Sequence, residues 1–516
     1  MIRFDSVRQS NKPLEALAWL VGGVGLVWFA VNWILSGDSE FQELTALMAV
    51  GAGIAIFALG NWRKGFYVFS LWLVLEDFAR KFLGNNMVVY FAKDALIAIV
   101  YVAFLNEFRR RTEQAWRPPF LVPFLCFFWW AVMEAFNPAT VSISYSLLGL
   151  KLYFYYVPLM FLGYALIRTE LDLRQFLLFN LFLGSLVSLV GIIQAISGQS
   201  FLNPQVFGQD LMANFDRFAP VSGVVFNRPN SVFVSDGRFG GYLILMWILS
   251  FGTIGYLMLR EGRVRKVVYL CAALVAAAIL LSGVRTAFVY SLIGSVVMVA
   301  GVVWGAPFRK EQLLRMLRGI RRFMLLGAAG VVCVALFYPS ALSSRWAFYS
   351  ETLSPNGRGS ELANRGWRYP LSEFIKTFSY NGWHWGRGLG TSSLGTQYVA
   401  RLLHAPSPGP GVENGYGQML LEIGVLGLIL WIVFAIAVAL ACWRVVRKLR
   451  GSSMFPLAFA IFWFACVVLL PLSFIGLSTY QDFVINSYLW TLIGILFRLP
   501  VIAPERSIQV ASVMRP

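Results

Sequence analysis

The sequence predicts an all-α protein that crosses a membrane many times. Of the 516 residues, 58% are hydrophobic and only 13% are charged, and the mean hydropathy is +0.67. A soluble chain carries about 25% charged residues, so a water-soluble enzyme and a disordered chain are both excluded as the main interpretation. The apolar residues also fall into runs of about 20, which is the length that a membrane-spanning helix needs.

About fourteen such runs follow one another along the chain, and we expect each to be a transmembrane helix. Their approximate ranges are 14–35, 43–60, 66–79, 88–106, 118–134, 146–167, 175–197, 239–259, 267–283, 286–304, 324–340, 418–442, 455–476 and 483–498. The first run has no small-residue cleavage site, so we expect it to be a retained anchor. The predicted segments are an N-terminal transmembrane bundle (1–200), a transmembrane core with the first outer loop (201–340), an extracytoplasmic loop of short helices (341–417) and a C-terminal transmembrane bundle (418–516).

The charge distribution predicts that both termini are cytoplasmic. With the N-terminus inside, 28 of the 43 Lys and Arg residues fall in cytoplasmic segments, as the positive-inside rule requires. We therefore interpret the net charge of +18, including the basic run Arg309–Arg322, as a topology signal and expect no nucleic-acid partner. The five cysteines all lie in apolar runs, where we expect packing roles.

Two outer segments are long enough to carry a function, namely Gly198–Arg238 and the loop 341–417. The second contains 364–378, in which apolar residues from Trp367 to Phe378 recur at helical spacing. We expect a short amphipathic helix there, lying on the outer membrane face.

Charged residues interrupt two of the predicted spans, which is costly in a membrane and often marks function. Lys93 and Asp94 interrupt the fourth span, and Lys151 lies near the start of the sixth. A structural pair of Asp94 with either lysine would account for them. Alternatively, Lys151 faces an anionic substrate.

Arginines on the outer side are the strongest candidates for binding. Arg285 lies in a very short turn between two spans, and Arg228 and Arg238 precede the eighth span. Guanidinium groups bind phosphate oxygens bidentately, although an arginine at this depth can also extend to ordinary lipid headgroups. Arg365, in the amphipathic segment, completes the candidate substrate-binding arginines.

A carboxylate at the start of the twelfth span is the candidate general base. Glu413 precedes Asn414 and Tyr416, which we include as candidate substrate-binding residues. A carboxylate at the rim of an apolar bundle can have a raised pKa and accept a proton. His384 and His404 are alternative bases, and no motif predicts a metal or another cofactor.

Four short motifs in residues 220–440 resemble those of the O-antigen ligase and O-antigen polymerase superfamily. They are NRPNSVFVSDGRFGGYL before one span, SGVRTAF between two spans, GRGLGTSS in the large outer loop and ENGYGQMLLEIGVLGL opening a span. The resemblance implies a metal-independent membrane glycosyltransferase of the GT-C type. Its members transfer a glycan from undecaprenyl pyrophosphate to an acceptor hydroxyl at the outer face of the bacterial inner membrane.

The resemblance also implies roles for particular residues. Arg285 and Arg228 correspond to arginines that hold the pyrophosphate, and Glu413 falls where ligases commonly have a histidine. This departure favours a polymerase of exopolysaccharide, capsule or O-antigen repeat units over a ligase that moves the glycan to a lipid or protein acceptor. The implied partners are the lipid-linked donor, a glycan or lipid acceptor, membrane lipids, a chain-length regulator and a flippase.

A transporter is the alternative from another class, either a lipid-linked glycan flippase or a small-anion carrier. A transporter should show broken helices in repeat-related positions, and we find no internal repeat. It also has no need of an ordered outer loop of about 75 residues. The transferase is therefore the favoured interpretation.

Overall fold

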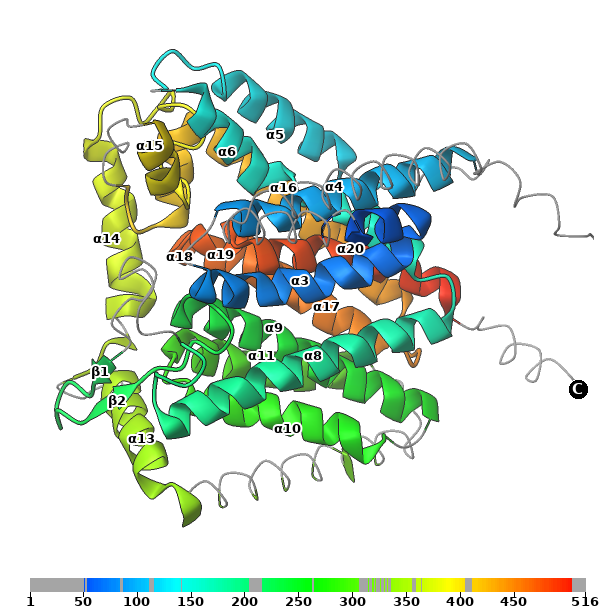
Figure 1. Cartoon of the computed structure of the whole chain (residues 1–516), viewed down its shortest axis with the longest axis vertical. Helices are drawn as coiled ribbons and strands as arrows, with labels where there is room; N and C mark the ends of the chain where they lie inside the picture. Colours follow the sequence, from blue (N-terminus) through cyan, green and yellow to red (C-terminus); the bar gives the residue numbers. More distant parts are fainter. Residues whose placement is uncertain are drawn as a thin grey trace, which may run out of the picture. The chain divides into compact units, whose positions relative to one another are not determined.

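The computed structural model describes most of residues 51–503, with gaps at 84–86, 111–115, 204–215, 262–263, most of 306–335, 355–358 and 404–410, and at the single positions 52, 141 and 363. The described part is almost wholly helical (Figure 1). Its longer helices are α3 (Trp62–Phe82), α4 (Met87–Arg110), α5 (Leu121–Glu134), α6 (Ile143–Phe154), α7 (Leu159–Leu166), α8 (Glu170–Ser197), α9 (Asp236–Glu261), α10 (Lys266–Leu281), α11 (Arg285–Gly305), α13 (Pro339–Leu353), α14 (Tyr369–Lys376), α15 (Thr396–Leu403), α16 (Gly415–Lys448), α17 (Phe455–Val467) and α20 (Phe483–Ile502). The remaining elements are the strands β1 (Asp216–Phe218) and β2 (Val225–Asn227) and the short helices η1 (Asn364–Arg368), η2 (Thr377–Ser379), η3 (Val468–Leu472), α18 (Ser473–Ile475) and α19 (Ser478–Gln481).

The chain forms two compact units. The first comprises Met1–Glu76 and Asn86–Gln114, and the second comprises Asp77–Asn85 and Ala115–Pro516. Helix α3 therefore passes from the first unit into the second. Every candidate site residue predicted from the sequence belongs to the second unit.

In the first unit, the buried lysine of α4 has a carboxylate partner. The Lys93 side chain is fully buried, and its Nζ lies 3.8 Å from Oε1 of Glu76. The same Nζ donates to the carbonyl of Tyr90 and lies 3.5 Å from the centre of that ring. Lys93 thus has an ion pair with Glu76 of α3, a partner that the sequence did not suggest, and the predicted pair of Asp94 with a lysine stays a prediction.

Within the described residues, eight helices are long and apolar enough to cross a membrane. They cover Val88–Arg109, Ile143–Leu166, Glu170–Ser197, Asp236–Glu261, Arg285–Gly305, Gly415–Lys448, Phe455–Ile475 and Phe483–Ile502. The chain is therefore an all-α, multi-pass membrane protein, which confirms that part of the predicted fold class, whereas the fourteen spans and the orientation stay predictions. Helices α3, α5 and α10 coincide with three further predicted spans. The predicted spans 14–35, 43–60 and 324–340 lie wholly or partly outside the described residues.

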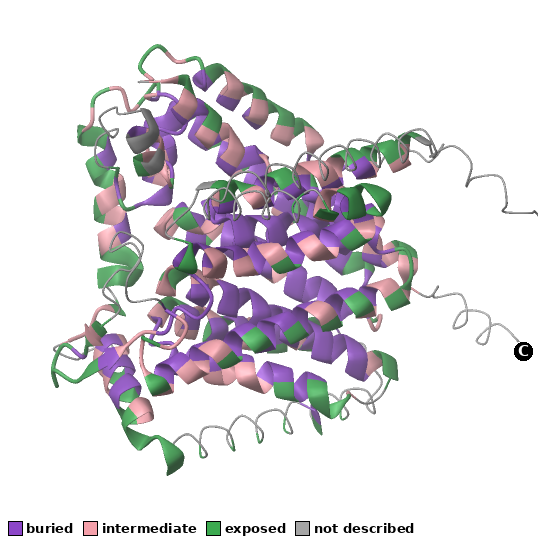
Figure 2. Ribbon diagram, viewed as in Figure 1, coloured by how far each residue is buried: buried purple, intermediate pink, exposed green. Residues whose placement is uncertain are grey.

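The core of the second unit is a bundle of long helices that run side by side (Figure 1). Their facing sides are buried along most of their length (Figure 2). Large aromatic rings fill the interior: Phe434 stacks on Trp490 at 5.8 Å, and Phe127 meets Trp431 edge-on at 5.5 Å. Such packing stabilises a helix bundle in lipid, where contact between apolar side chains and lipid tails gives no hydrophobic driving force.

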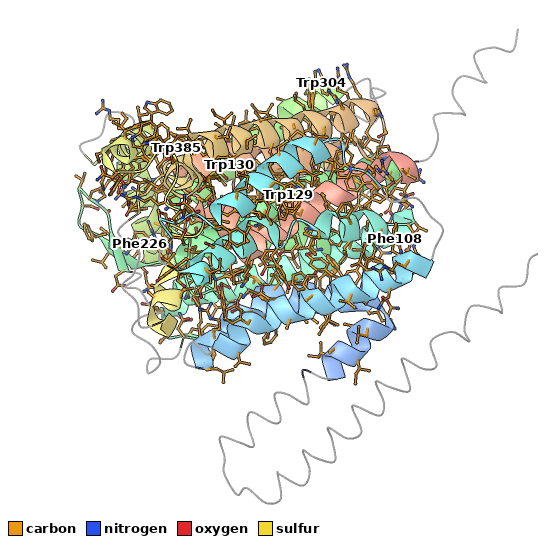
Figure 3. The ribbon with its side chains drawn as sticks, turned by 90° about the horizontal axis from the view of Figure 1, so that it is seen from above. Phe108, Trp129, Trp130, Phe226, Trp304 and Trp385 are labelled. Atoms are coloured by element: carbon orange, nitrogen blue, oxygen red, sulfur yellow. The ribbon has the colours of Figure 1, made fainter. Side chains whose placement is uncertain are left out.

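The short elements gather at one end of this bundle, which we call the loop end. The hairpin β1–β2 and the helices α13, α14 and α15 all lie there (Figure 1). The segment 364–379 is continuously helical as η1, α14 and η2, which confirms the helix predicted in this stretch. Phe226 and Trp385 mark the loop end in Figure 3, and Trp304 marks the opposite end.

Candidate functional site

A tight turn between α10 and α11 positions the first of the predicted arginines. Gly283 has a positive φ of 65°, and a side chain there would collide with the ring of Phe226. The hydroxyl of Ser282 accepts a hydrogen bond from the amide of Val284 at 3.1 Å, which closes the turn. Glycine suits this backbone because it adopts positive φ without strain. The SGVR motif thus makes Arg285 the first residue of α11, at the loop end.

Arg285 and Arg228 lie on the same aromatic ring. The two guanidinium carbons are 5.3 and 5.4 Å from the centre of the Phe348 ring, which is contributed by α13 and is buried. Arg285 pairs with Glu361 at 2.5 Å, and Arg228 pairs with Asp236 at 2.9 Å. A ring face attracts cations within about 6 Å, so Phe348 holds both arginines in one place. The structure therefore brings together the two residues that the resemblance assigned to pyrophosphate.

Other arginines contribute to the electrostatic surroundings of Arg228. Burial lowers the pKa of its guanidinium, Asp236 opposes that shift, and the nearby Arg217 and Arg285 lower the pKa further. Arg217 and Arg285 thus add positive charge near Arg228, which pairs with Asp236. Among the described residues, the buried Nε of Arg228 has no hydrogen-bond partner. An anion would supply negative charge and an acceptor for that donor.

A continuous series of contacts leads from the arginine pair to Glu413. Oε2 of Glu361, which contacts Arg285, also lies 3.7 Å from Nε of Arg365. The Arg365 guanidinium lies 4.9 Å from the centre of the Tyr369 ring. The Tyr369 hydroxyl in turn donates to Oε2 of Glu413 at 2.6 Å. Arg285, Arg365 and Glu413, which are far apart in sequence, therefore belong to one connected array.

Glu413 is exposed, whereas its neighbour Asn414 is buried in structural contacts. The amide of Glu413 donates to Oε2 of Glu373 at 2.9 Å. Asn414 is the N-cap of α16: its Oδ1 accepts from the amide of Gly417 at 2.8 Å, and its Nδ2 donates to the carbonyl of Pro370 at 3.0 Å. N-cap side chains of this kind stabilise the first turn of a helix. Asn414 thus fixes the base of the segment that presents Glu413.

Four other predicted residues are not part of this array. The Tyr416 hydroxyl donates to the carbonyl of Leu470 at 3.4 Å, and its ring lies 5.5 Å from that of Phe474. Lys151 lies half-buried on α6. His384 is exposed, and its carbonyl accepts from the amide of Val425 at 3.1 Å, whereas His404 lies outside the described residues.

Arg238 belongs to a buried ion network at the start of α9. Its Nη1 donates to both oxygens of Asp77, at 2.9 and 2.8 Å, and its Nε lies 3.1 Å from Asp482. Asp77 also pairs with Arg80 at 3.2 Å, and the Arg238 guanidinium covers the ring of Phe483 at 4.6 Å. These contacts fasten α9 to the end of α3 and the start of α20, which is an anchoring role.

A glycine-rich stretch of the outer loop is inserted against α16. Gly386, Gly388 and Gly390 all have φ between 82° and 97°, and a side chain on Gly390 would collide with the carbonyl of Tyr145. The sequence did not single out Glu422, yet this fully buried carboxylate holds the stretch in place. It accepts hydrogen bonds from the amide of Ser392 and the hydroxyl of Ser393, both at 2.8 Å, and from the hydroxyl of Tyr153 at 3.0 Å.

Sequence reasoning missed three residues of the arginine site, namely Asp236, Phe348 and Glu361. Only Glu361 had a local signal, because it lies four residues before Arg365 and is paired with it. Within the described part of the chain, no three His, Cys, Asp or Glu side chains gather as a metal site requires.

The fold and the site define a class: a multi-pass α-helical membrane protein with a cluster of arginines at one end of its bundle. In comparisons with known proteins, the sequence matches no protein-family model and none of the curated proteins.

Proposed function

We propose that this protein is a membrane glycosyltransferase that polymerises glycan repeat units carried on undecaprenyl pyrophosphate. The observation that supports the proposal best is the shared ring of Phe348, which holds Arg228 and Arg285 together. Two adjacent guanidinium groups suit the two phosphates of a pyrophosphate ester. The contacts through Arg365 and Tyr369 to Glu413 then connect the leaving-group site with a proton acceptor.

The proposed reaction is a single displacement. The acceptor hydroxyl oxygen forms a bond with the anomeric carbon of the donor glycan, and the bond between that carbon and the pyrophosphate oxygen breaks. The acceptor proton passes to the carboxylate of Glu413, and the electron pair leaves with the pyrophosphate. Arg285 and Arg228 stabilise the charge that grows on the leaving group, which is where preorganised donors contribute most. Pyrophosphate leaves without protonation, so one carboxylate suffices.

The proposal includes the finer topology. About fourteen spans place both termini in the cytoplasm and the loop end on the outer face of the bacterial inner membrane. An acceptor glycan, a flippase that supplies the donor and a chain-length regulator are the proposed partners. The presence of Glu413 in place of a histidine favours the polymerase over the ligase.

Substitution of Arg285 tests the proposal directly. Purified protein would be assayed with lipid-linked repeat units by following polymer length on gels. Arg285→Ala should lower the transfer rate about 100-fold, because one contact to the transition-state charge is worth about 3 kcal/mol. Arg285→Lys should remain poor, since an ammonium cannot form the bidentate fork.

Arg368→Ala is the matched control, because Arg368 is an exposed arginine of the neighbouring η1. It should retain normal transfer. Normal polymer from Arg285→Ala, with that variant folded and inserted, would reject the pyrophosphate role. The arginine would then be a lipid-headgroup contact.

A further inference from the structure

The anion that pairs with Arg285 in this structure is a side chain of the protein itself. Oε2 of Glu361 lies 2.5 Å from Nη1 of Arg285. We infer that Glu361 is a displaceable counter-ion, which holds Arg285 in the unliganded protein and gives up that position to a pyrophosphate oxygen. The identity of the displacing anion rests on the proposed function. The exchange itself requires only that the site binds pyrophosphate, and it does not require glycan transfer.

The pair has the properties of a contact that can open. Arg285 is 24% exposed and Glu361 is 35% exposed, so water reaches both groups. Ion pairs that remain accessible to water contribute little to stability. The pair between Arg238 and Asp77 is the opposite case, because Asp77 is 1% exposed and both of its oxygens accept from the arginine. Of these two arginine–carboxylate pairs, the buried one with Asp77 is built to persist and the accessible one with Glu361 is not.

The released carboxylate keeps a partner. The same Oε2 of Glu361 lies 3.7 Å from Nε of Arg365, whose side chain is 56% exposed. When pyrophosphate binds Arg285, Glu361 remains beside Arg365. The negative charge of Glu361 therefore stays compensated. The exchange therefore avoids the cost of leaving a carboxylate without a counter-charge.

The backbone around Glu361 is held in place while its side chain moves. The amide of Glu361 donates to the carbonyl of Thr352 at 2.9 Å, and its carbonyl accepts from the amide of Arg365 at 2.7 Å. These bonds connect the end of α13 with the start of η1. A change of side-chain rotamer at Glu361 is then sufficient for the exchange, without unfolding of either helix.

Pyrophosphate can displace the carboxylate because it offers more charge and more acceptors. Glu361 offers Arg285 one oxygen, whereas pyrophosphate can contact Arg285 and Arg228 together across the ring of Phe348. Arg228 has a buried Nε with no hydrogen-bond partner among the described residues, so a second contact is open to the ligand. Multiple charge-assisted hydrogen bonds outcompete a single accessible one.

The test measures binding of inorganic pyrophosphate to the purified full chain in detergent by isothermal titration calorimetry. Glu361→Gln removes the competing charge and keeps the side-chain shape. It should bind pyrophosphate about 2- to 5-fold more tightly than the unaltered protein, which corresponds to the loss of one accessible ion pair. An unchanged or weaker affinity would overturn the inference.

Glu351→Gln is the matched control. Glu351 is a carboxylate at the same end of the molecule, but it accepts hydrogen bonds from the amides of Val221 and Ser222 at 2.7 and 3.2 Å. Its replacement should leave pyrophosphate affinity unchanged. An equal gain in Glu351→Gln would mean that any lost negative charge strengthens binding, and the specific exchange would be wrong. Glu361→Ser repeats the measurement with a small neutral side chain if Glu361→Gln fails to fold.

Two further measurements distinguish a lipid headgroup from pyrophosphate as the ligand. They also distinguish failure of the exchange from failure of the transferase proposal. If Glu361→Gln gains affinity for dispersed phosphatidylglycerol and none for pyrophosphate, the ligand is a lipid headgroup and the inference fails as stated. If Glu361→Gln gains affinity for pyrophosphate but the unaltered protein transfers no glycan, the exchange stands and the transferase proposal fails. Glycan transfer without any gain in Glu361→Gln would reject the exchange alone.

Discussion

Replacement of Phe348 by leucine separates the roles of the shared ring from those of the arginines themselves. The ring face carries Arg228, which is 12% exposed, and Arg285, which is 24% exposed. A cation over an aromatic face is worth about 0.5–1 kcal/mol when exposed and about 2 kcal/mol when desolvated. Both guanidinium groups lie between these limits, so Phe348→Leu should remove about 1–3 kcal/mol of positioning energy. Leucine still fills most of the space.

Part of that loss will appear as weaker ligand binding. If half of the positioning energy is expressed in the bound state, pyrophosphate affinity should fall about 3- to 10-fold. Phe348 also meets Phe226 edge-on at 5.0 Å, a contact worth about 0.5–1.5 kcal/mol, so the thermal unfolding midpoint should fall as well. Calorimetric titration with pyrophosphate and a thermal melt measure the two effects separately.

Phe288→Leu is the control for packing alone. Phe288 packs against the same hydrophobic cluster and stacks on Tyr349 at 4.7 Å, and no described guanidinium lies over its ring. It should lower the unfolding midpoint and leave pyrophosphate affinity unchanged. Equal losses of affinity in Phe348→Leu and Phe288→Leu would refute the reasoning, because the ring of Phe348 would then serve packing only.

Three further predictions concern the base, the inserted loop and the topology. Glu413→Gln should lower glycan transfer about 100- to 10,000-fold and let lipid-linked repeat units accumulate, whereas Glu413→His should restore part of the rate, because the position needs a proton acceptor. Glu422→Gln should raise amide hydrogen exchange across residues 384–395, measured by mass spectrometry, because an amide side chain is a weaker acceptor than a buried carboxylate for the bonds from Ser392 and Ser393. In a chain without its five cysteines, a cysteine at the exposed Ser372 should react with a membrane-impermeant maleimide in intact cells, and one at Gly451 should not.

Each of these predictions has a contrary outcome. Normal transfer by Glu413→Gln would remove the base and leave Glu413 as a hydrogen-bond partner of Tyr369. If His384→Ala behaves as Glu413→Gln should, that histidine becomes the base. Unchanged hydrogen exchange in Glu422→Gln would show that the glycine-rich backbone holds the loop without the carboxylate. Labelling at Gly451 and protection at Ser372 would reverse the orientation.

The sequence predicted those features that depend on residues close together in the chain. Apolar runs predict helices in lipid because every backbone polar group must be satisfied within the segment, and eleven of the fourteen predicted spans coincide with described helices. The helical spacing from Trp367 to Phe378 predicted the segment 364–379 for the same reason. The short turn at Arg285 and the stretch containing Arg228 both pointed to the arginine pair, because each is unusual within its own few residues.

The missing parts of the site depend on contacts between distant segments. Phe348 is an ordinary aromatic residue of α13 until the fold brings the guanidinium groups of Arg228 and Arg285 within 5.4 and 5.3 Å of the centre of its ring. Arg238 looked equivalent to Arg228 in sequence, and only the fold shows that it lies against Asp77 of α3 and Asp482 before α20. These partners come from different helices, so no pattern within one segment could have separated the two arginines.

The arginines of the loop end can be sorted by how many of their donors are already used. A guanidinium group has five N–H donors and accepts no hydrogen bond. Arg345 is 3% exposed and donates to four backbone carbonyls, those of Leu281, Ala341, Ala195 and Asn227. Burial lowers its pKa to about 10. Backbone carbonyls accept most of its N–H donors, so few donors remain for a ligand.

Arg228 and Arg285 differ from Arg345 in this respect. Among the described residues, each donates one side-chain hydrogen bond, to Asp236 and Glu361 respectively, and each is placed by Phe348 rather than by its own donors. An aromatic face fixes the position of a guanidinium group without consuming an N–H. The ring therefore keeps the two arginines close together while most of their donors remain open, which is the condition for binding a multivalent anion.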